Sequence, residues 1–139
     1  MRYLVPLLVG LAVSACTAAP PAETSAYAAR QQAKLAALTA GKVAGAPVSC
    51  LPAYRQNDMI TIDENTIAFR EGRSRVYVNH LNGGCSNLES GHYALVTHPL
   101  GSQLCRGDIA QVVDLMNHIT VGSCVIGDFV PYTMAGARY

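Results

Sequence analysis

Four cysteines in the second part of this 139-residue chain limit its fold more than any other feature. They are Cys50, Cys85, Cys105 and Cys124, and no two of them form a CxxC pair. Without CxxC there is no support for a zinc ribbon or a thioredoxin-like redox site. In an exported chain of this length, four cysteines most simply form two disulfides. The question is therefore whether the chain is exported.

The N-terminus has the pattern of an export signal. Arg2 precedes an uncharged, mostly apolar run over residues 3–13. That run is too short to span a bilayer as a helix, which takes roughly 20 residues, but it suits the core of a signal peptide. Residues 13–16 (VSAC) resemble a bacterial lipobox. The resemblance implies cleavage after residue 15, diacylglycerol on the sulfur of Cys16, and an acyl chain on its new amino group.

The residue after the lipobox indicates the membrane in which the protein is anchored, and the charge balance indicates which partners are excluded. Thr17, and not Asp, follows Cys16, which by resemblance to lipoprotein sorting in enteric bacteria indicates the outer membrane. We expect a lipid anchor there, with the protein facing the periplasm of a Gram-negative cell. Removing Arg2 with the signal leaves nine Lys and Arg against nine Asp and Glu. This balance supplies no field for nucleic acid, so none is expected as a partner.

Composition shifts along the chain predict a tether followed by one domain. A segment over about residues 25–40 is rich in Ala, Gln, Leu and Lys, which favour a helix. Its apolar face is thin, so the helix is predicted either to be only partly stable or to lie along the domain. Ser25 is a candidate N-cap and Gly41 a candidate stop, and residues 41–49 are predicted to be a flexible link. The expected division is a signal peptide over 1–15, a tether with the Ala-rich helix over 16–49, a disulfide-bonded β domain over 50–132, and a C-terminal tail over 133–139.

Alternating apolar residues in the domain predict β-strands. Glu64-Asn65 and Gly72 mark turns between the first three strands. Residues 109–116 also fit a helical face with Asp108 as N-cap, and the cluster of β-branched residues favours a strand. The fold class is mainly β, a small disulfide-stapled meander or partly open barrel after an N-terminal helix. The predicted strands cover residues 59–63, 66–70, 74–80, 92–98, 109–114 and 120–132, and Gly127 interrupts the last of them.

Four cysteines allow three pairings. We favour Cys50–Cys124, which would join the two ends of the domain, together with Cys85–Cys105, which would close an internal segment.

The domain resembles a family of small exported proteobacterial proteins of unknown function, many of them lipoprotein candidates. The resemblance covers roughly residues 50–132, and its cysteine pattern implies two structural disulfides. It implies no activity and no catalytic residues. It rests on Cys50-Leu51 and Cys85, and on residues 65–70 (NTIAFR), 76–79 (VYVN), 104–108 (LCRGD), 113–114 (VD) and 122–132 (GSCVIGDFVPY).

Several polar residues are candidates for sites of chemistry. The four histidines (His80, His92, His98 and His118) lack the spacing of a metal site, and His92 and His98 would lie about 20 Å apart on one strand. Asp108 and Asp114 have no nucleophile motif beside them, so turn or capping roles are favoured over acid–base catalysis. Arg106-Gly107-Asp108 spells an RGD tripeptide, a weak indication of adhesion. Arg70, Arg73 and Arg75 surround a turn and are a candidate contact for anionic lipid or polymer.

These observations favour a binding or structural module of the cell envelope over an enzyme. We expect no catalytic residues, no metal and no cofactor. The expected partners are the membrane, through the lipid on Cys16, and an envelope protein or polymer. Inhibition of an envelope-active enzyme such as lysozyme is an alternative by analogy. A small hydrolase or metal-binding protein, built from the histidines and aspartates, is a further one.

Overall fold

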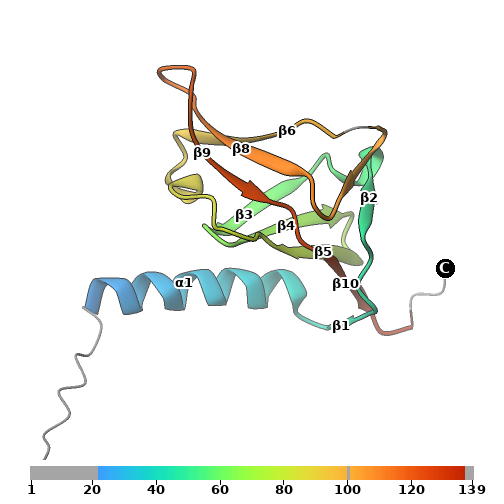
Figure 1. Cartoon of the computed structure of the whole chain (residues 1–139). Coiled ribbons are helices and arrows are strands. Elements are labelled where there is room, and N and C mark those ends of the chain that lie inside the picture. Colours follow the sequence, from blue (N-terminus) through green and yellow to red (C-terminus); the bar gives the residue numbers. More distant parts are fainter. Residues whose placement is uncertain (1–21, 100, 137–139) are drawn as a thin grey trace, which may run out of the picture.

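The computed structural model describes residues 22–99 and 101–136 (Figure 1). The predicted signal peptide and Cys16 lie outside these residues. The first element of the described part is helix α1 (Ala22–Thr39). It continues through β1 (Lys42–Ala44), β2 (Cys50–Pro52), the 3-10 turn η1 (Ala53–Arg55), β3 (Met59–Asp63), β4 (Thr66–Glu71), β5 (Arg75–His80), the 3-10 turn η2 (Leu88–Ser90), β6 (Tyr93–Thr97), β7 (Gln103–Cys105), β8 (Ile109–Asp114), β9 (Ile119–Val125) and β10 (Phe129–Met134).

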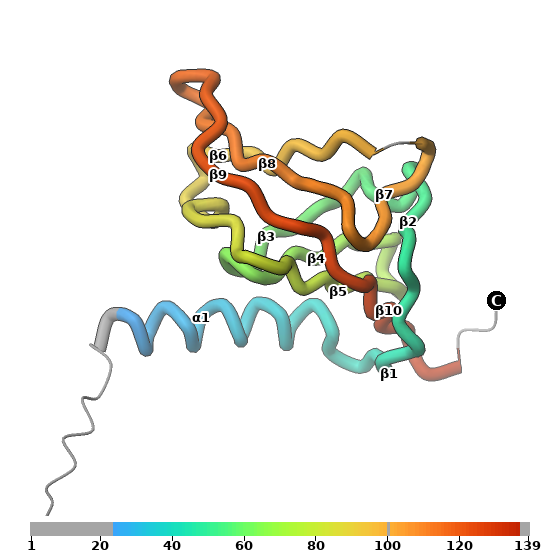
Figure 2. Tube along the Cα trace, in the orientation of Figure 1, coloured from blue at the N-terminus to red at the C-terminus, as the bar shows by residue number. Residues whose placement is uncertain are grey.

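The elements form three layers, as Figures 1 and 2 show. A central sheet has the strand order β1-β10-β5-β4-β3, and α1 lies along one of its faces. An outer sheet, β6-β8-β9, covers the opposite face, and the β2–β7 pair closes one side. All the pairings are antiparallel, and β3, β4 and β5 form the predicted meander. The mainly β prediction is confirmed, and the described sheets stay open without closing into a barrel.

Strands β4 and β5 have apolar residues at successive positions, whose side chains point alternately to the two faces of the central sheet. This explains why the sheet is covered on both faces. Ile67 and Phe69 belong to the core beneath the outer sheet, whereas Ala68 between them packs on the helix side. Tyr77 and Val78 divide in the same way on β5. Successive side chains of a strand point to opposite faces, so a strand that is apolar at every position must be buried on both.

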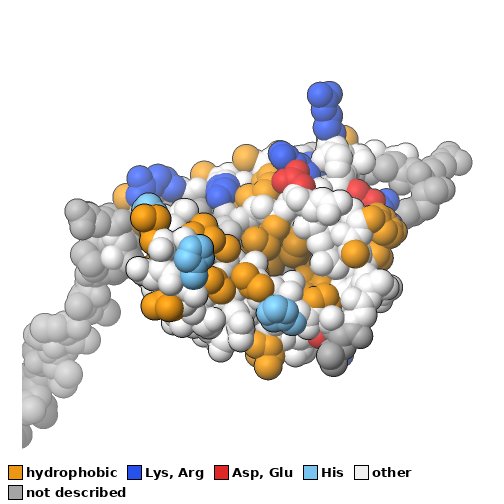
Figure 3. Space-filling view, turned by 90° about the horizontal axis from the view of Figure 1, so that it is seen from above, with side chains coloured by type: hydrophobic (Ala, Val, Ile, Leu, Met, Phe, Trp, Pro, Cys, Tyr) orange, Lys and Arg blue, Asp and Glu red, His pale blue; other side chains and the backbone are white. Residues whose placement is uncertain are grey.

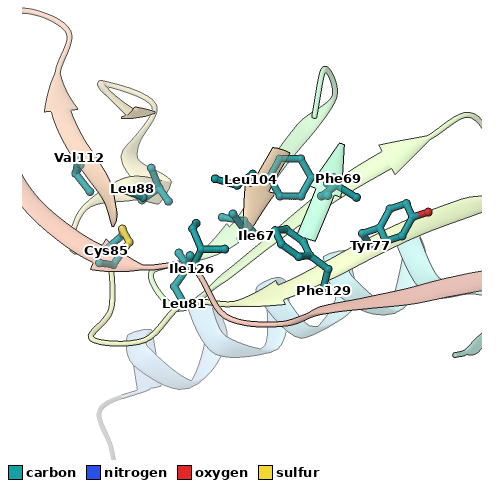
Figure 4. Packing of buried hydrophobic residues seen from close by; sticks show 13 residues of the cluster. Ile67, Phe69, Tyr77, Leu81, Cys85, Leu88, Leu104, Val112, Ile126 and Phe129 are labelled. Carbon is teal, nitrogen blue, oxygen red and sulfur yellow. A yellow bond between two sulfur atoms is a disulfide. The ribbon is translucent and has the colours of Figure 1, made fainter. Parts of the chain in front are cut away.

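The main core lies between the central and outer sheets (Figure 4). The rings of Phe69 and Phe129 lie 5.9 Å apart at a tilt of 57°. Leu51 and Leu104, from the β2–β7 pair, are at most 2% exposed and close the side of this core. Ala110 and Val112 contribute from the outer sheet. Apolar side chains from every layer except the helix therefore meet in one cluster.

The Ala-rich segment is a docked helix and not part of a tether. Leu35 and Leu38 pack on the helix-side face of the central sheet, and the ammonium of Lys34 donates to the carbonyl of Thr61. The helix begins at Ala22, so Ser25 lies within it and is not the N-cap that the sequence suggested. Gly41, in the left-handed region at φ 69°, follows its end as predicted.

The predicted flexible link over 41–49 is also wrong. β1 pairs with β10 along its whole length. Further on, the N–H of Gly45 donates to the carbonyl of Pro131 at 2.7 Å, and Val48 and Phe129 exchange two backbone hydrogen bonds of 2.9 Å. The folded part therefore begins before residue 50, because the strand that completes the sheet lies in the supposed link.

The disulfides join Cys50 to Cys105 and Cys85 to Cys124. The favoured pairing, Cys50–Cys124 with Cys85–Cys105, is wrong. Cys50 and Cys105 stand directly opposite each other in the β2–β7 pair, with Cα atoms 4.0 Å apart. The reason lies in β2 and β7, two short strands that the sequence did not reveal. The bridges close overlapping loops with separations of 55 and 39 residues, each worth about 4 kcal/mol in the chain-entropy account when taken singly.

The segment 120–132, predicted as a last strand interrupted by Gly127, is two strands joined by a corner at that glycine. β9 ends in the outer sheet and β10 begins in the central sheet, so the chain changes layers around Gly127. Asn79, fully buried on β5, accepts a hydrogen bond from the Gly127 N–H and donates to the Gly127 carbonyl, at 3.1 and 2.8 Å. Its amide also lies 3.2 Å from the carbonyl of Asp128. One side chain thereby satisfies the buried backbone of the corner.

Digestion without reductant should distinguish the three disulfide pairings. Trypsin leaves Cys85 and Cys105 together in peptide 76–106, and cleavage after Glu89 by Glu-C protease separates them. We expect peptide 43–55 linked to 90–106, and 76–89 linked to 107–138, by mass spectrometry. A link between 43–55 and 107–138 would restore the pairing that the sequence favoured.

Replacing Gly127 with alanine should be strongly destabilising. A Cβ at this position would lie 2.2 Å from the carbonyl oxygen of His80, so the corner would have to shift and strain the bonds to Asn79. We expect a loss of about 3 kcal/mol in urea unfolding, the upper end for overpacking. Gly122→Ala is the matched control, because its Cβ would meet nothing within 4 Å. Equal effects of the two substitutions would contradict the close approach at Gly127.

Candidate binding surface

The outer sheet has one face in the core and one face that no described element covers. Ala110, Val112 and Cys124 are buried, so the residues that alternate with them point outward. Ile109 is 61% and Val125 36% exposed. We call this surface the open face. It consists of Val96 on β6, Ile109, Gln111 and Val113 on β8, and Ser123 and Val125 on β9.

The open face is uncharged, which is unusual for the exposed side of a sheet. None of its six side chains is Asp, Glu, Lys or Arg. Figure 3 looks down on this face and shows apolar and histidine side chains across it, with the charged groups mainly along one margin. Antiparallel sheets usually turn a polar face to water. A sheet with apolar residues on both faces is typical of a surface that contacts another body.

A hollow of about 380 Å³ lies at one end of the open face, lined by His98, Gly107, Asp108, Ile109 and Gln111. A second hollow, of about 300 Å³, lies on the other side of Asp108. The Asp108 carboxylate accepts a hydrogen bond from the N–H of Cys105 at 2.7 Å. Asp108 thus shapes the turn between β7 and β8, as the capping reading of this residue predicts.

The turn between β8 and β9 lies beyond the other end of the open face. The Asp114 carboxylate accepts hydrogen bonds from the N–H groups of Met116 and Asn117, at 2.7 and 3.2 Å, and from the Asn117 side chain at 2.8 Å. The bond from the Asn117 side chain, followed by that from the Met116 backbone, lowers the pKa of Asp114. The carboxylate therefore fixes the turn.

The two aspartates weighed as an acid–base pair thus serve two different turns. The histidines are similarly dispersed: His92 and His98 flank β6, His118 lies in the β8–β9 turn at φ 56°, and His80 lies 3.4 Å from the hydroxyl of Thr66 through its Nδ1. Among residues 22–99 and 101–136, no group of three or more His, Cys, Asp or Glu is placed to hold a metal ion.

The residues of the RGD tripeptide take part in local contacts of the β7–β8 connection. Arg106 pairs with Asp128 at 3.2 Å, Gly107 takes φ 95°, and Asp108 binds the backbone of its own turn. The structure gives the motif a local role in connecting β7 to β8.

The three arginines around Gly72 do not form one patch. Arg70 pairs with Asp58 at 2.7 Å. Arg75 pairs with Glu71 at 3.1 Å and approaches the hydroxyl of Tyr77. Strand alternation separates Arg70 from Arg75, because the two lie on opposite faces of the central sheet. The surface that remains is a hollow of about 370 Å³ lined by Lys42, Arg70 and Arg73 together with apolar atoms at the end of α1.

Sequence reasoning missed the group around Glu71. Arg55 lies 3.3 Å from Glu71 and donates to the Tyr77 hydroxyl at 2.8 Å. Its guanidinium stands 5.2 Å from the ring centre of Tyr54 and 5.6 Å from that of Tyr77. Burial raises the pKa of Tyr77, against the lowering effect of the two guanidinium groups. The 3-10 turn η1 brings Arg55 here, and no periodic pattern marks that turn.

Comparison with known proteins identifies the family and no function. Residues 1–134 match the model of a family of unknown function, DUF6491, and the chain belongs to that family. The match includes the N-terminal segment, whereas the resemblance seen in the sequence covered only residues 50–132. No curated protein and no solved structure matches the chain. Within residues 22–99 and 101–136, no helix is long and apolar enough to cross a membrane.

The β8–β9 turn should lose order in acid. Because the folded state lowers the pKa of Asp114, the carboxylate contributes stability above its unfolded pKa, and this contribution disappears as pH falls through the folded value. An NMR titration should show the Asp114 carboxyl titrating below the usual range of aspartates, together with shifts at the amides of Met116 and Asn117. Asp114→Asn is the control and should abolish that transition. An ordinary aspartate pKa would contradict the role given to the carboxylate.

Proposed function

Starting from membership in a family of unknown function, we propose that this protein is a non-enzymatic, lipid-anchored module of the bacterial cell envelope. It is held in the outer membrane by the acyl groups on Cys16 and faces the periplasm. It binds a protein partner through the open face. The observation that carries this proposal is the uncharged, partly apolar outer surface of β6, β8 and β9, to which no described element is docked.

The open face suits a protein partner better than a polymer of sugars or nucleotides. The cores of protein interfaces are depleted in charge and contain apolar side chains, with polar groups at the rim. Ile109 at 61% exposure loses the most water on docking, and Gln111 and Ser123 can supply hydrogen bonds. A nucleic acid or an acidic polymer would require Lys or Arg, which the open face lacks.

The disulfides support export, and the lipobox supports the anchor. All four cysteines of the described chain are paired, which is typical of an oxidising compartment. Cys16 lies outside the described residues, and its acylation rests on residues 13–16. Several acyl chains on one residue give stable membrane binding, whereas one chain alone is marginal.

The same structure disfavours the hydrolase alternative. A general acid–base pair needs two groups that converge on one substrate position. Asp108 and Asp114 instead accept backbone hydrogen bonds in turns at opposite ends of β8. A binding surface uses the rigid sheet between those turns, and it needs no reactive side chain.

Charge on the open face should abolish partner binding without unfolding the protein. We expect a photo-crosslinker at Gln111, in the full acylated chain within its own envelope, to yield an adduct with a second protein. Adding Ile109→Arg should reduce that adduct at least about tenfold, as for an interface residue that is desolvated on binding. The matched control is Val43→Arg, because Val43 lies on β1 and has the same exposed fraction, 61%.

Thermal unfolding should change by less than a few degrees in either variant, since both side chains are largely exposed. Equal loss of the adduct in the two variants would contradict a specific open face. The anchor is tested separately: Cys16→Ser should abolish labelling by radioactive palmitate, and retained label would refute it.

A further inference from the structure

We propose that the turn between β8 and β9 is a second membrane contact, inserting Leu115 and Met116 into the surface of the bilayer that holds the lipid anchor. This inference rests on the lipid anchor of the proposed function. It concerns a different surface, because the turn lies beyond the end of the open face. We call residues 115–119 the hairpin tip.

The side chains of the hairpin tip are unsuited to water. Turns are normally built from Gly, Pro, Asn, Asp and Ser. Here Met116 is 76%, Ile119 55% and Leu115 49% exposed. The tip itself contains no Lys, Arg, Asp or Glu. Transfer of apolar groups of this size from water to the boundary between headgroups and acyl chains lowers the free energy.

The tip is also held in shape before any contact. The Leu115 N–H donates to the His92 carbonyl at 2.9 Å, and the His118 N–H donates to the Asp114 carbonyl at 2.8 Å. The Asp114 carboxylate binds the Met116 N–H from the other side of the turn. Pre-organisation lowers the entropy cost of insertion. The carboxylate of Asp114, next to the tip, is hydrogen-bonded within the turn.

The tip lies at the end of the molecule where the anchor must be. Helix α1 begins at Ala22, and Figure 1 shows this end of the helix and the projecting tip both at the left of the body, on opposite sides of the central sheet. Only five residues, 17–21, lie between the acylated cysteine and the helix. The six residue steps from Cys16 to Ala22 span at most about 20 Å. The proposal therefore places the bilayer surface at this end of the body, where it would meet both the anchor and the tip.

Because the lipid anchor holds the protein at the membrane, a small apolar contact is sufficient for the tip to insert. Tethering converts the second contact into an intramolecular event at a high effective concentration. A tip with two or three apolar side chains, too weak to bind vesicles alone, can then be inserted most of the time. Two contacts also restrict how the module rotates on the membrane, which a single flexible anchor does not.

The chain contains no tryptophan, so one introduced tryptophan is a unique reporter. We would compare Met116→Trp with Tyr54→Trp in the full acylated chain, bound to vesicles of phosphatidylethanolamine and phosphatidylglycerol. Tyr54 is 67% exposed on η1, which follows β2 at the other end of the body. We expect a blue-shifted emission and quenching by brominated lipids for Met116→Trp only. Circular dichroism should be unchanged in both variants.

Each other outcome overturns the inference. If the protein floats with the vesicles but Met116→Trp emits as in water and resists quenching, the tip does not insert and the anchor stands. If both tryptophans are quenched equally, the protein adsorbs without using the tip. If the acylated chain is not formed, as judged by palmitate labelling, the anchor of the proposed function fails first. If a photo-crosslinker at Met116 in the native envelope captures a protein and not lipid, the tip is a protein contact instead.

Discussion

The hydrogen bonds between the Asn79 side chain and the backbone of Gly127 are the interaction on which the rest of the structure depends. Here the chain leaves the outer sheet and enters the central sheet, and its backbone polar groups are buried away from water. Leaving one such group unpaired costs about 1–3 kcal/mol, and Asn79 pairs both the N–H and the carbonyl of Gly127. The close approach to the His80 carbonyl leaves room only for glycine.

The position of the corner determines the layers on either side of it. It places β10 next to β5, and β10 in turn provides the edge on which β1 pairs. Because β1 follows α1 closely, this pairing lays the helix along the central sheet. The corner also brings Cys124 opposite Cys85, so the second disulfide reinforces the same crossing. The start of α1, and with it the reach of the lipid anchor, follows from this chain of contacts.

Much of the sheet could be predicted from local pattern, because its strands alternate clearly. Met59–Asp63 and Ile109–Asp114 have the predicted bounds, and the strand reading of the latter was right where a helical face also fitted. β1, β2 and β7 have three residues each and exist only through their partners, so no local signal reveals them. The disulfide pairing follows from β2 and β7, so it could not be predicted from the sequence.

The candidate surface was only partly visible in the sequence. Residues 109–113 and 119–125 have apolar residues on both strand parities, which predicts a sheet apolar on two faces. Which sheet face stays uncovered depends on where α1 docks. The thin apolar stripe of that helix, Leu35 and Leu38, did not indicate that it packs on the central sheet. The Arg55 group required tertiary structure, since it joins η1 to β4 and β5.

Hydrogen exchange at the Gly127 amide tests the central claim most directly. If the corner holds the two sheets together, this amide opens only when the whole domain unfolds. Its exchange should then give the same free energy and the same denaturant dependence as the amides of Ala68 and Val78 in the central strands. Exchange of the Gly127 amide through a local opening, while those strands remain protected, would contradict the account.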